Sequence, residues 1–266
     1  MLHNRLLQNK YKLMALVLCL CLLVDMVLHK GLVRVMVPKK FPDYRVSAVY
    51  PNNNNTLINT GKAWVKAVNT IALMNSIHKD CRGLECDIYF DLSKSIFEVH
   101  HDEDISTGLN LDDLLQVYRD RGLKASIWFD FKNLDETTAG KSLSTLSSLR
   151  NKYALNNKIL VESSKTKLLK IFSDSGFFTS YYTPMFNPYL ANEDSLKHWV
   201  DSLSTVIRWS SVNAISGYYF QYPFLHRYFP DFPILIWSPN DRFSLVNMVY
   251  KQFIANDKSV FIALYP

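Results

Sequence analysis

Apolar and polar positions follow two alternating patterns after residue 62. Short apolar runs are separated by stretches in which apolar residues recur at spacings of three and four, as is typical of buried strands and amphipathic helices. These runs predict eight strands, and a ninth at 96–100 that forms a hairpin with the second. The eight strands are expected at 63–68, 83–90, 124–131, 158–162, 177–182, 213–218, 233–237 and 259–264. Helices are expected near 71–79, 111–121, 139–153, 165–175, 192–208, 222–228 and 242–255.

The helix expected at 111–121 carries the clearest local signals. Asn110 precedes it as an N-cap residue, Leu111, Leu114 and Leu115 form an apolar stripe, and Gly122 follows as a helix-ending residue. Caps and stops of this kind satisfy the backbone groups that a helix leaves unpaired at its ends. The segment 110–131 therefore predicts a helix that returns directly to a strand.

Eight strands that alternate with helices predict an α/β fold of the (β/α)₈ TIM-barrel type. The structural alternative is an open, doubly wound sheet. Such sheets usually carry a glycine-rich phosphate loop after the first strand, and the sequence has none there. We expect residues 63–266 to form the barrel.

An apolar run precedes the predicted barrel. It extends from Leu13 to Val24 and continues to Leu28, interrupted only by Asp25, with basic residues on both sides. The run predicts an uncleaved membrane-anchor helix within residues 1–37, with a cleaved signal peptide and a buried soluble helix as alternatives. Residues 38–62, rich in Pro and Asn, are expected to form a linker. We expect a single-pass membrane protein, with an extracytoplasmic or lumenal barrel favoured.

The charge distribution supports a membrane location over nucleic-acid binding. The formal net charge is +6. Residues 1–45 hold eight Lys and Arg and two acidic residues, so the remaining chain, with 22 of each sign, is neutral. A neutral barrel lacks the basic surface that nucleic acids require, whereas basic residues beside an apolar run suit a membrane surface.

Acidic residues gather late in the second and third predicted strands. Glu85 and Asp87 are two positions apart and so share one face of a strand, as do Asp130 and Lys132 in the third strand. Lys66, late in the first strand, is expected to face the same axis. Barrel active sites lie at this end of the strands. Three convergent carboxylates are costly to bury without a cation or another positive partner. Glu85, Asp87 and Asp130 therefore predict a site for Mg²⁺ or Ca²⁺, with a buried salt-bridge network at the barrel mouth as the alternative.

These motifs resemble the glycerophosphodiester phosphodiesterases, which belong to the phospholipase-C-like phosphodiesterase barrels. The similarity extends from Trp64 to Leu134. It includes Glu85-Cys86-Asp87, His101-Asp102 and Asp130-Phe131-Lys132. The segments Ala67-Val68-Asn69-Thr70 and Trp128-Phe129-Asp130-Phe131-Lys132 are similar to menorin-type domains.

The resemblance implies a role for each matching residue. Glu85, Asp87 and Asp130 correspond to metal ligands, His101 to a proton-transferring histidine and Lys132 to a substrate-facing lysine. His100 competes with His101, because a shift of one residue exchanges their faces. Glu162 and Trp237 stand where the family has further strand-end residues, and we expect both to bind substrate.

One position departs from the family. Lys66 stands where the first strand of the family ends in histidine. Beside carboxylates a lysine stays charged, so Lys66 is expected to neutralise phosphate or to replace part of the metal's charge.

The sequence therefore predicts metal-assisted hydrolysis of a phosphodiester, either a glycerophosphodiester or a lipid- or glycan-linked one. The alternative is a catalytically inactive barrel that binds a ligand or partner. Different chemistry on the same barrel is a third hypothesis. No G-x-S-x-G, Walker or H-E-x-x-H motif occurs, which excludes the mechanisms that depend on them. Tyr182 and Tyr219, at strand ends, are candidates to line a site for a polyol head group.

Overall fold

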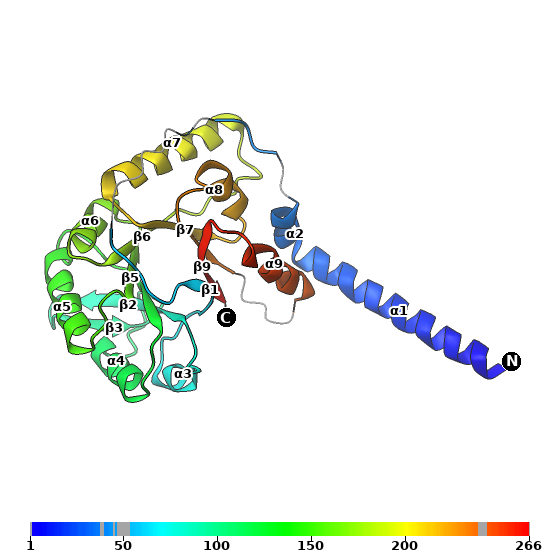
Figure 1. The fold of residues 1–266 in the computed structure, drawn as a ribbon, viewed down its shortest axis with the longest axis horizontal. Coiled ribbons are helices and arrows are strands. Elements are labelled where there is room, and N and C mark those ends of the chain that lie inside the picture. The colour runs from blue at the N-terminus through cyan, green and yellow to red at the C-terminus, as the bar shows by residue number, and fades with distance from the viewer. Residues whose placement is uncertain (1, 38–39, 45, 47–53, 239–243, 266) are drawn as a thin grey trace.

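The computed structural model describes residues 2–37, 40–44, 46, 54–238 and 244–265. A barrel of eight parallel strands is surrounded by helices, and one long helix projects from it (Figure 1). The barrel strands are β1 (Gly61–Val65), β2 (Gly83–Asp91), β4 (Ser126–Phe131), β5 (Ile159–Ser163), β6 (Phe178–Tyr182), β7 (Ala214–Tyr218), β8 (Ile234–Trp237) and β9 (Val260–Tyr265). This architecture confirms the predicted (β/α)₈ fold.

The barrel closes where its first strand pairs on both sides. β1 lies parallel to β9 and also to β2, where Val65 is opposite Leu84. The extra strand β3 (Ile96–Val99) runs antiparallel to β2 and forms the expected hairpin on the outside of the barrel. With both edges paired, the barrel exposes no open strand edge of its own.

Seven helices follow the barrel strands at the places that the apolar spacing predicts. They are α3 (Ile71–Ser76), α4 (Leu111–Asp120), α5 (Ala139–Lys152), α6 (Thr166–Asp174), α7 (Glu193–Ser210), α8 (Tyr222–Tyr228) and α9 (Leu245–Ala255). At the start of α4 the Asn110 side chain accepts a hydrogen bond of 2.9 Å from the Asp112 N–H, and Gly122 follows the helix with φ +66°. Both predicted end signals are therefore confirmed.

Alternation along the strands divides the apolar residues into two cores. One face of each strand packs beneath the helices, with Cys86, Ile127 and Phe129 fully buried there. The other face fills the barrel interior with a second cluster that includes Trp64, Trp128, Leu160, Phe178, Leu235 and Ile262. The space is tight, because a Cβ atom on Gly83 would lie 2.0 Å from the Trp64 ring. The interior is thus a packed core below the functional end.

The segment before β1 closes the amino-terminal end of the barrel. Leu57 packs into the interior cluster. The Asn55 side chain donates hydrogen bonds to the backbone oxygens of Ser173 and Phe177, at 2.7 and 2.8 Å. β1 begins at Gly61, so the first strand takes in the last two residues of the expected linker.

Two helices precede the barrel. The first, α1 (Leu2–Leu28), contains an apolar stretch at Asn9–Leu28 that is long enough to cross a membrane, and its side chains are exposed along most of that stretch. It extends away from the barrel (Figure 1). The short α2 (Lys30–Met36) packs on the barrel through Leu32 and Val35. The apolar helix has the properties of a membrane anchor or a signal sequence.

Candidate active site

The predicted acidic residues meet at the carboxyl ends of neighbouring strands. Asp87 of β2 lies opposite Asp130 of β4, which lies opposite Glu162 of β5. Glu85 lies one interior layer deeper, opposite Trp128. Because residues in register on adjacent strands share a face, four carboxyl groups line one side of the barrel.

A turn after β1 holds the deepest carboxyl group, that of Glu85. The half-buried Lys66 donates its backbone N–H to the Tyr265 oxygen at 2.8 Å. Ala67 then adopts a left-handed conformation with φ +55°. The turn brings the Ala67 N–H to 2.6 Å from Glu85 Oε2. Such a conformation costs a non-glycine residue about 1 kcal/mol, a cost that this hydrogen bond to a buried carboxyl group offsets.

Burial dominates the ionisation of Glu85, whose exposed fraction is 4%. Loss of water, and then the nearby charge of Asp87, raise the pKa of Glu85 to about 8. The Ala67 N–H opposes this shift, Asp130 adds to it, and Lys132 opposes it. In the absence of an added cation, Glu85 therefore holds a proton at neutral pH.

Asp87 is positioned by Asn69, a residue to which the sequence had assigned no role of its own. The Asn69 Nδ2 donates to Asp87 Oδ2 at 2.6 Å, and the Asn69 Oδ1 accepts the Asp87 backbone N–H at 2.9 Å. This reciprocal pair fixes both the backbone and the carboxylate of Asp87. Asn69 belongs to the motif that resembles menorin-type domains, and that motif was the signal available in the sequence.

Lys132 is a cation in direct contact with two carboxylates. Its Nζ lies 2.8 Å from Asp87 Oδ1 and also contacts Asp130. Burial alone would lower the pKa of Lys132, but Asp130 and Asp87 outweigh burial, and the pKa is raised. Burial raises the pKa of Asp130, whereas Lys132 lowers it. The ammonium group therefore remains charged and compensates part of the negative charge.

The three predicted ligands are close enough to share one cation. One carboxylate oxygen from each of Glu85, Asp87 and Asp130 lies within 4.8 Å of the others. Two ligands of one ion are separated by at most twice the bond length, which is about 4.2 Å for Mg²⁺ and about 5 Å for Ca²⁺. A buried, proton-holding Glu85 beside two carboxylates is an arrangement that a hard divalent ion would relieve. A separation of up to 4.8 Å lies within the limit for Ca²⁺, so the residues fit Ca²⁺ as they stand, whereas Mg²⁺ would draw them closer together.

Glu162 is a fully buried carboxyl group. It lies beneath the mouth of the barrel, which is the open end formed by the carboxyl ends of the strands. Among the residues that the structure describes, neither of its carboxyl oxygens has a hydrogen-bond partner. Burial raises its pKa well above the ordinary range and Asp130 adds to the shift, while the Ser216 and Ser180 hydroxyls, which are close but outside hydrogen-bond geometry, oppose it. Burial therefore disfavours the charged form of Glu162, and the group lies below the surface that a substrate would touch.

The two adjacent histidines occupy different environments. His100 is buried, stacks on Tyr89 with ring centroids 4.2 Å apart, and has its Nδ1 2.8 Å from the Asp102 backbone oxygen. His101 is 68% exposed and lines the pocket at the barrel mouth, with its Nδ1 2.8 Å from Asp102 Oδ1. A carboxylate on one ring nitrogen orients the ring and leaves the other nitrogen available. Of the two, His101 has the position suited to proton transfer.

An aromatic wall completes the mouth. Tyr182, Tyr218 and Trp237 end β6, β7 and β8. The Tyr182 ring stacks on Trp237 at 4.8 Å, and Tyr218 meets Trp237 edge-on at 5.2 Å. Tyr219, which we had expected here, packs instead near Gly31 of α2.

The pocket at the mouth has a volume of 300 Å³, at the lower end of the range for small-molecule sites. The residues that line it are His101, Asp130, Phe131, Lys132, Ser163, Ser164, Tyr182, Tyr218 and Trp237. Four predicted site residues, His101, Asp130, Lys132 and Trp237, thus share one pocket. Glu85, Asp87 and Glu162 lie buried in the barrel interior. Ser163 and Ser164 add hydroxyl groups to the pocket.

Comparison with solved structures finds phosphodiesterases that share this fold. A glycerophosphodiester phosphodiesterase from Parabacteroides distasonis matches with a TM-score of 0.54 and 14% identity, over 79% of this chain and 93% of that one. The enzyme from Agrobacterium tumefaciens matches with a TM-score of 0.53 and 14% identity, over 77% and 96%. An Oleispira antarctica phosphodiesterase in complex with sn-glycerol-3-phosphate matches at 0.50 and 10% identity, over 77% and 93%.

The chain is similar to these enzymes in its fold and not in its sequence. No protein-family model and no curated protein sequence matches the chain. At 10–14% identity the shared property is the fold, because one barrel can carry many chemistries. The chain therefore has the fold of the glycerophosphodiester phosphodiesterases, the family that the residues at its strand ends resemble.

Proposed function

We propose that the protein is a phosphodiester hydrolase, held at a membrane by α1, with residues 63–266 as its catalytic barrel. The observation that carries the proposal is the arrangement of side chains at the barrel mouth. Three carboxylates within reach of one cation lie beside Lys132 and beneath His101, at the carboxyl end of a barrel. This arrangement supplies positive charge for a phosphoryl group and a group for proton transfer within one pocket.

Each residue at the mouth has a role in the proposed reaction. Glu85, Asp87 and Asp130 would hold Mg²⁺ or Ca²⁺, which when bound stabilises the charge that develops on phosphoryl oxygens. Lys132 donates to a phosphoryl oxygen, and the exposed nitrogen of His101 moves a proton to or from the reacting oxygens. The wall of Tyr182 and Trp237 offers apolar faces against which a glycerol or other polyol group packs. Lys66 adds positive charge near the end of β1.

The direct test is hydrolysis by the full-length protein in detergent micelles. Glycerophosphocholine and bis(p-nitrophenyl) phosphate serve as substrates, with Mg²⁺, Ca²⁺ or a chelator. We expect divalent-dependent hydrolysis that is lost in Glu85→Gln and His101→Gln. The matched control is Glu136→Gln, which alters an exposed carboxylate that is not among the residues lining the pocket. Absence of hydrolysis, together with no thermal shift on adding either ion, would refute the proposal.

A second candidate function is ligand binding without turnover. It is favoured by the contact of Lys132 with Asp87 and Asp130, which compensates their charge with no added ion, and by Lys66 in place of the family's histidine. Binding of glycerol 3-phosphate without hydrolysis would support this function. Activity gained in Lys66→His would then identify that substitution as the cause.

A further inference from the structure

The outer face of α9 is apolar. Leu245, Met248 and Val249 are 44%, 58% and 58% exposed, and Phe253 is 43% exposed. Spacings of three and four place these residues on one side of the helix. The opposite side is also apolar, with Val246, Tyr250 and Ile254 buried against the barrel.

This face distinguishes α9 from an ordinary surface helix. A barrel helix that is exposed to water carries polar residues outside, as α4 does with its exposed Asp113, Arg119 and Asp120. A helix with apolar residues on both sides has a second apolar neighbour. The contacts at the start of α9 indicate which neighbour this is.

The start of α9 is joined to the end of the candidate membrane span. The Val246 backbone N–H donates to Asp25 Oδ2 at 3.0 Å. Val24 and Leu28 of α1 line a groove together with Ser244, the N-cap residue of α9. In Figure 1, α9 lies at the base of α1, on the side of the barrel from which α1 projects. The outer face of α9 is therefore continuous with the exposed apolar surface of α1.

The length of the span fixes where a bilayer would end. Asn9–Leu28 has 20 residues, and at 1.5 Å per residue this matches a hydrocarbon core of about 30 Å. A bilayer centred on the span would therefore reach its surface near Leu28. The helix α9, with Leu245, Met248 and Val249 on its outer face, begins near that level, because the Val246 backbone N–H is hydrogen-bonded to Asp25.

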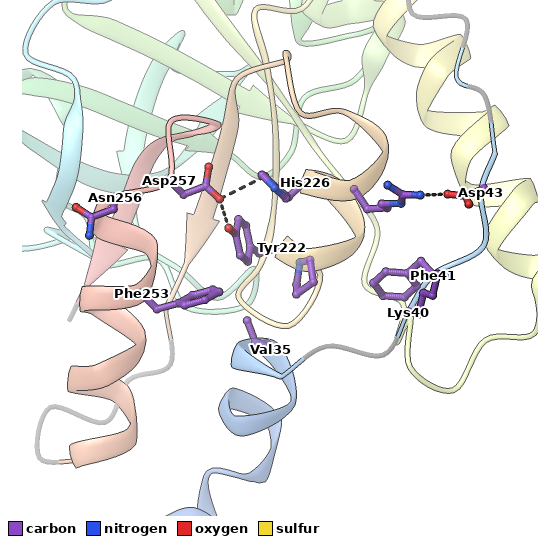
Figure 2. A pocket seen from close by; sticks show the side chains of 11 residues that line it. Val35, Lys40, Phe41, Asp43, Tyr222, His226, Phe253, Asn256 and Asp257 are labelled. Carbon is purple, nitrogen blue, oxygen red and sulfur yellow. Dashed lines mark hydrogen bonds and ion pairs between the residues drawn. The ribbon is translucent and has the colours of Figure 1, made fainter.

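A pocket extends the apolar surface beyond α9. It has a volume of 730 Å³ and lies between α2, α8 and α9, with Val35, Phe41 and Phe253 on its walls (Figure 2). Five of the residues that line it carry ionisable side chains: Lys40, Asp43, His226, Arg227 and Asp257. Arg227 contacts Asp43, and the His226 Nδ1 lies 3.3 Å from Asp257. Apolar walls suit the chains and glycerol backbone of a lipid, and Lys40 at the pocket suits its anionic head group.

We propose that the bilayer holding α1 also covers the outer face of α9, so that the α8–α9 side of the barrel rests on the lipid surface and the pocket behind Phe253 opens to lipid. The proposal depends on the membrane-anchor role of α1 and not on hydrolysis. Leu245, Met248 and Val249 insert among the lipids, as on helices that lie in a membrane interface. The barrel is thus held in one orientation and does not turn freely on α1.

The test uses the full-length protein in phosphatidylcholine vesicles. The photoreactive residue p-benzoylphenylalanine replaces Met248, and lipid adducts are measured by mass spectrometry after illumination. The same residue at Leu18 reports whether α1 is in the bilayer. At the exposed Lys141 of α5, on the opposite side of the barrel from α1 (Figure 1), it provides the control. We expect adducts at positions 18 and 248 at similar yield, at least an order of magnitude above position 141.

A second variant makes the test independent of the probe at 248. With the probe at Leu245, the double change Met248→Glu and Val249→Glu should lower its lipid adducts several-fold and leave those at position 18 unchanged. Both replaced side chains are exposed, so the barrel core is retained. Adducts at 18 but none at 245 or 248, or protein–protein adducts at 248, would overturn the inference and leave the anchor intact. Absence of adducts at 18 would overturn the anchor and this inference together, while hydrolysis is decided by its own assay.

Discussion

Replacement of Glu85 by glutamine should stabilise the metal-free protein at neutral and alkaline pH. Glutamine has almost the same shape, and its Oε1 can accept the Ala67 N–H that now lies 2.6 Å from Glu85 Oε2. It carries no ionisable proton. The change therefore removes only the cost of ionising a carboxyl group that is buried beside Asp87 and Asp130.

The magnitude follows from the pKa of Glu85, which burial and Asp87 raise from 4.5 to about 8. Below pH 4.5 the group is protonated in the folded and unfolded chains, so its ionisation costs nothing. Between 4.5 and 8 the unfolded chain loses the proton and the folded chain keeps it, so the free energy of unfolding falls as pH rises. The fall is about 1.4 kcal/mol per pH unit, or about 3 kcal/mol at pH 7 and at most about 5 kcal/mol above pH 8.

The assay is urea unfolding of the full-length wild type and variant in detergent micelles, followed by circular dichroism in chelator at pH 5, 7 and 9. The variant should gain stability over the wild type as pH rises, because titrating groups that do not interact with Glu85 cancel in the difference. Calcium at ten times its Kd should then stabilise the wild type by about 1.4 kcal/mol and leave the variant unchanged. A difference in the free energy of unfolding between wild type and variant that is the same at all three pH values would refute the reasoning. Glu136→Gln provides the reference, since its difference from the wild type should not change with pH.

Four further changes test the mouth and the barrel interior. Lys132→Met leaves Asp87 and Asp130 without their cation and should lower the free energy of unfolding by about 3 kcal/mol at pH 7 in chelator; equal stability would show that the contact is unimportant. Gly83→Ala forces a Cβ atom into the Trp64 ring and should cost about 3 kcal/mol by overpacking, seen as a lower thermal midpoint. His101→Asn should lower kcat by about 10²–10⁴, whereas the same change at His100 should lower stability and leave kcat within a factor of about ten.

Local patterns explain why much of the barrel was predictable. Each strand alternates between two environments, so Glu85 and Asp87 had to share a face whatever their neighbours. The α4 helix begins directly after its N-cap residue Asn110 and ends before Gly122, because both signals act through backbone groups a few residues away. These features depend on interactions within one element, and such interactions can be read from a sequence.

The features that the sequence could not predict depend on irregular backbone and on contacts between residues far apart in the chain. His100 and His101 lie beyond the end of β3 at Val99, where alternation no longer decides which ring faces the mouth. Asn69 reaches Asp87 only because the chain turns at Ala67. Likewise, Leu57 fills the base of the barrel through contacts with strands far along the chain. No spacing rule encodes such contacts.

The tryptophans inside the barrel give the protein an internal optical reporter. Trp64 and Trp128 are buried in the interior, Trp128 lies opposite Glu85 in the strand register, and Trp237 stands 6.2 Å from Trp128 at the mouth. Indole emission responds to the electric field around the ring. Arrival of an ion or a phosphate among the carboxylates should therefore change the intrinsic fluorescence, so ligands of this protein can be sought by titration before any reaction is known.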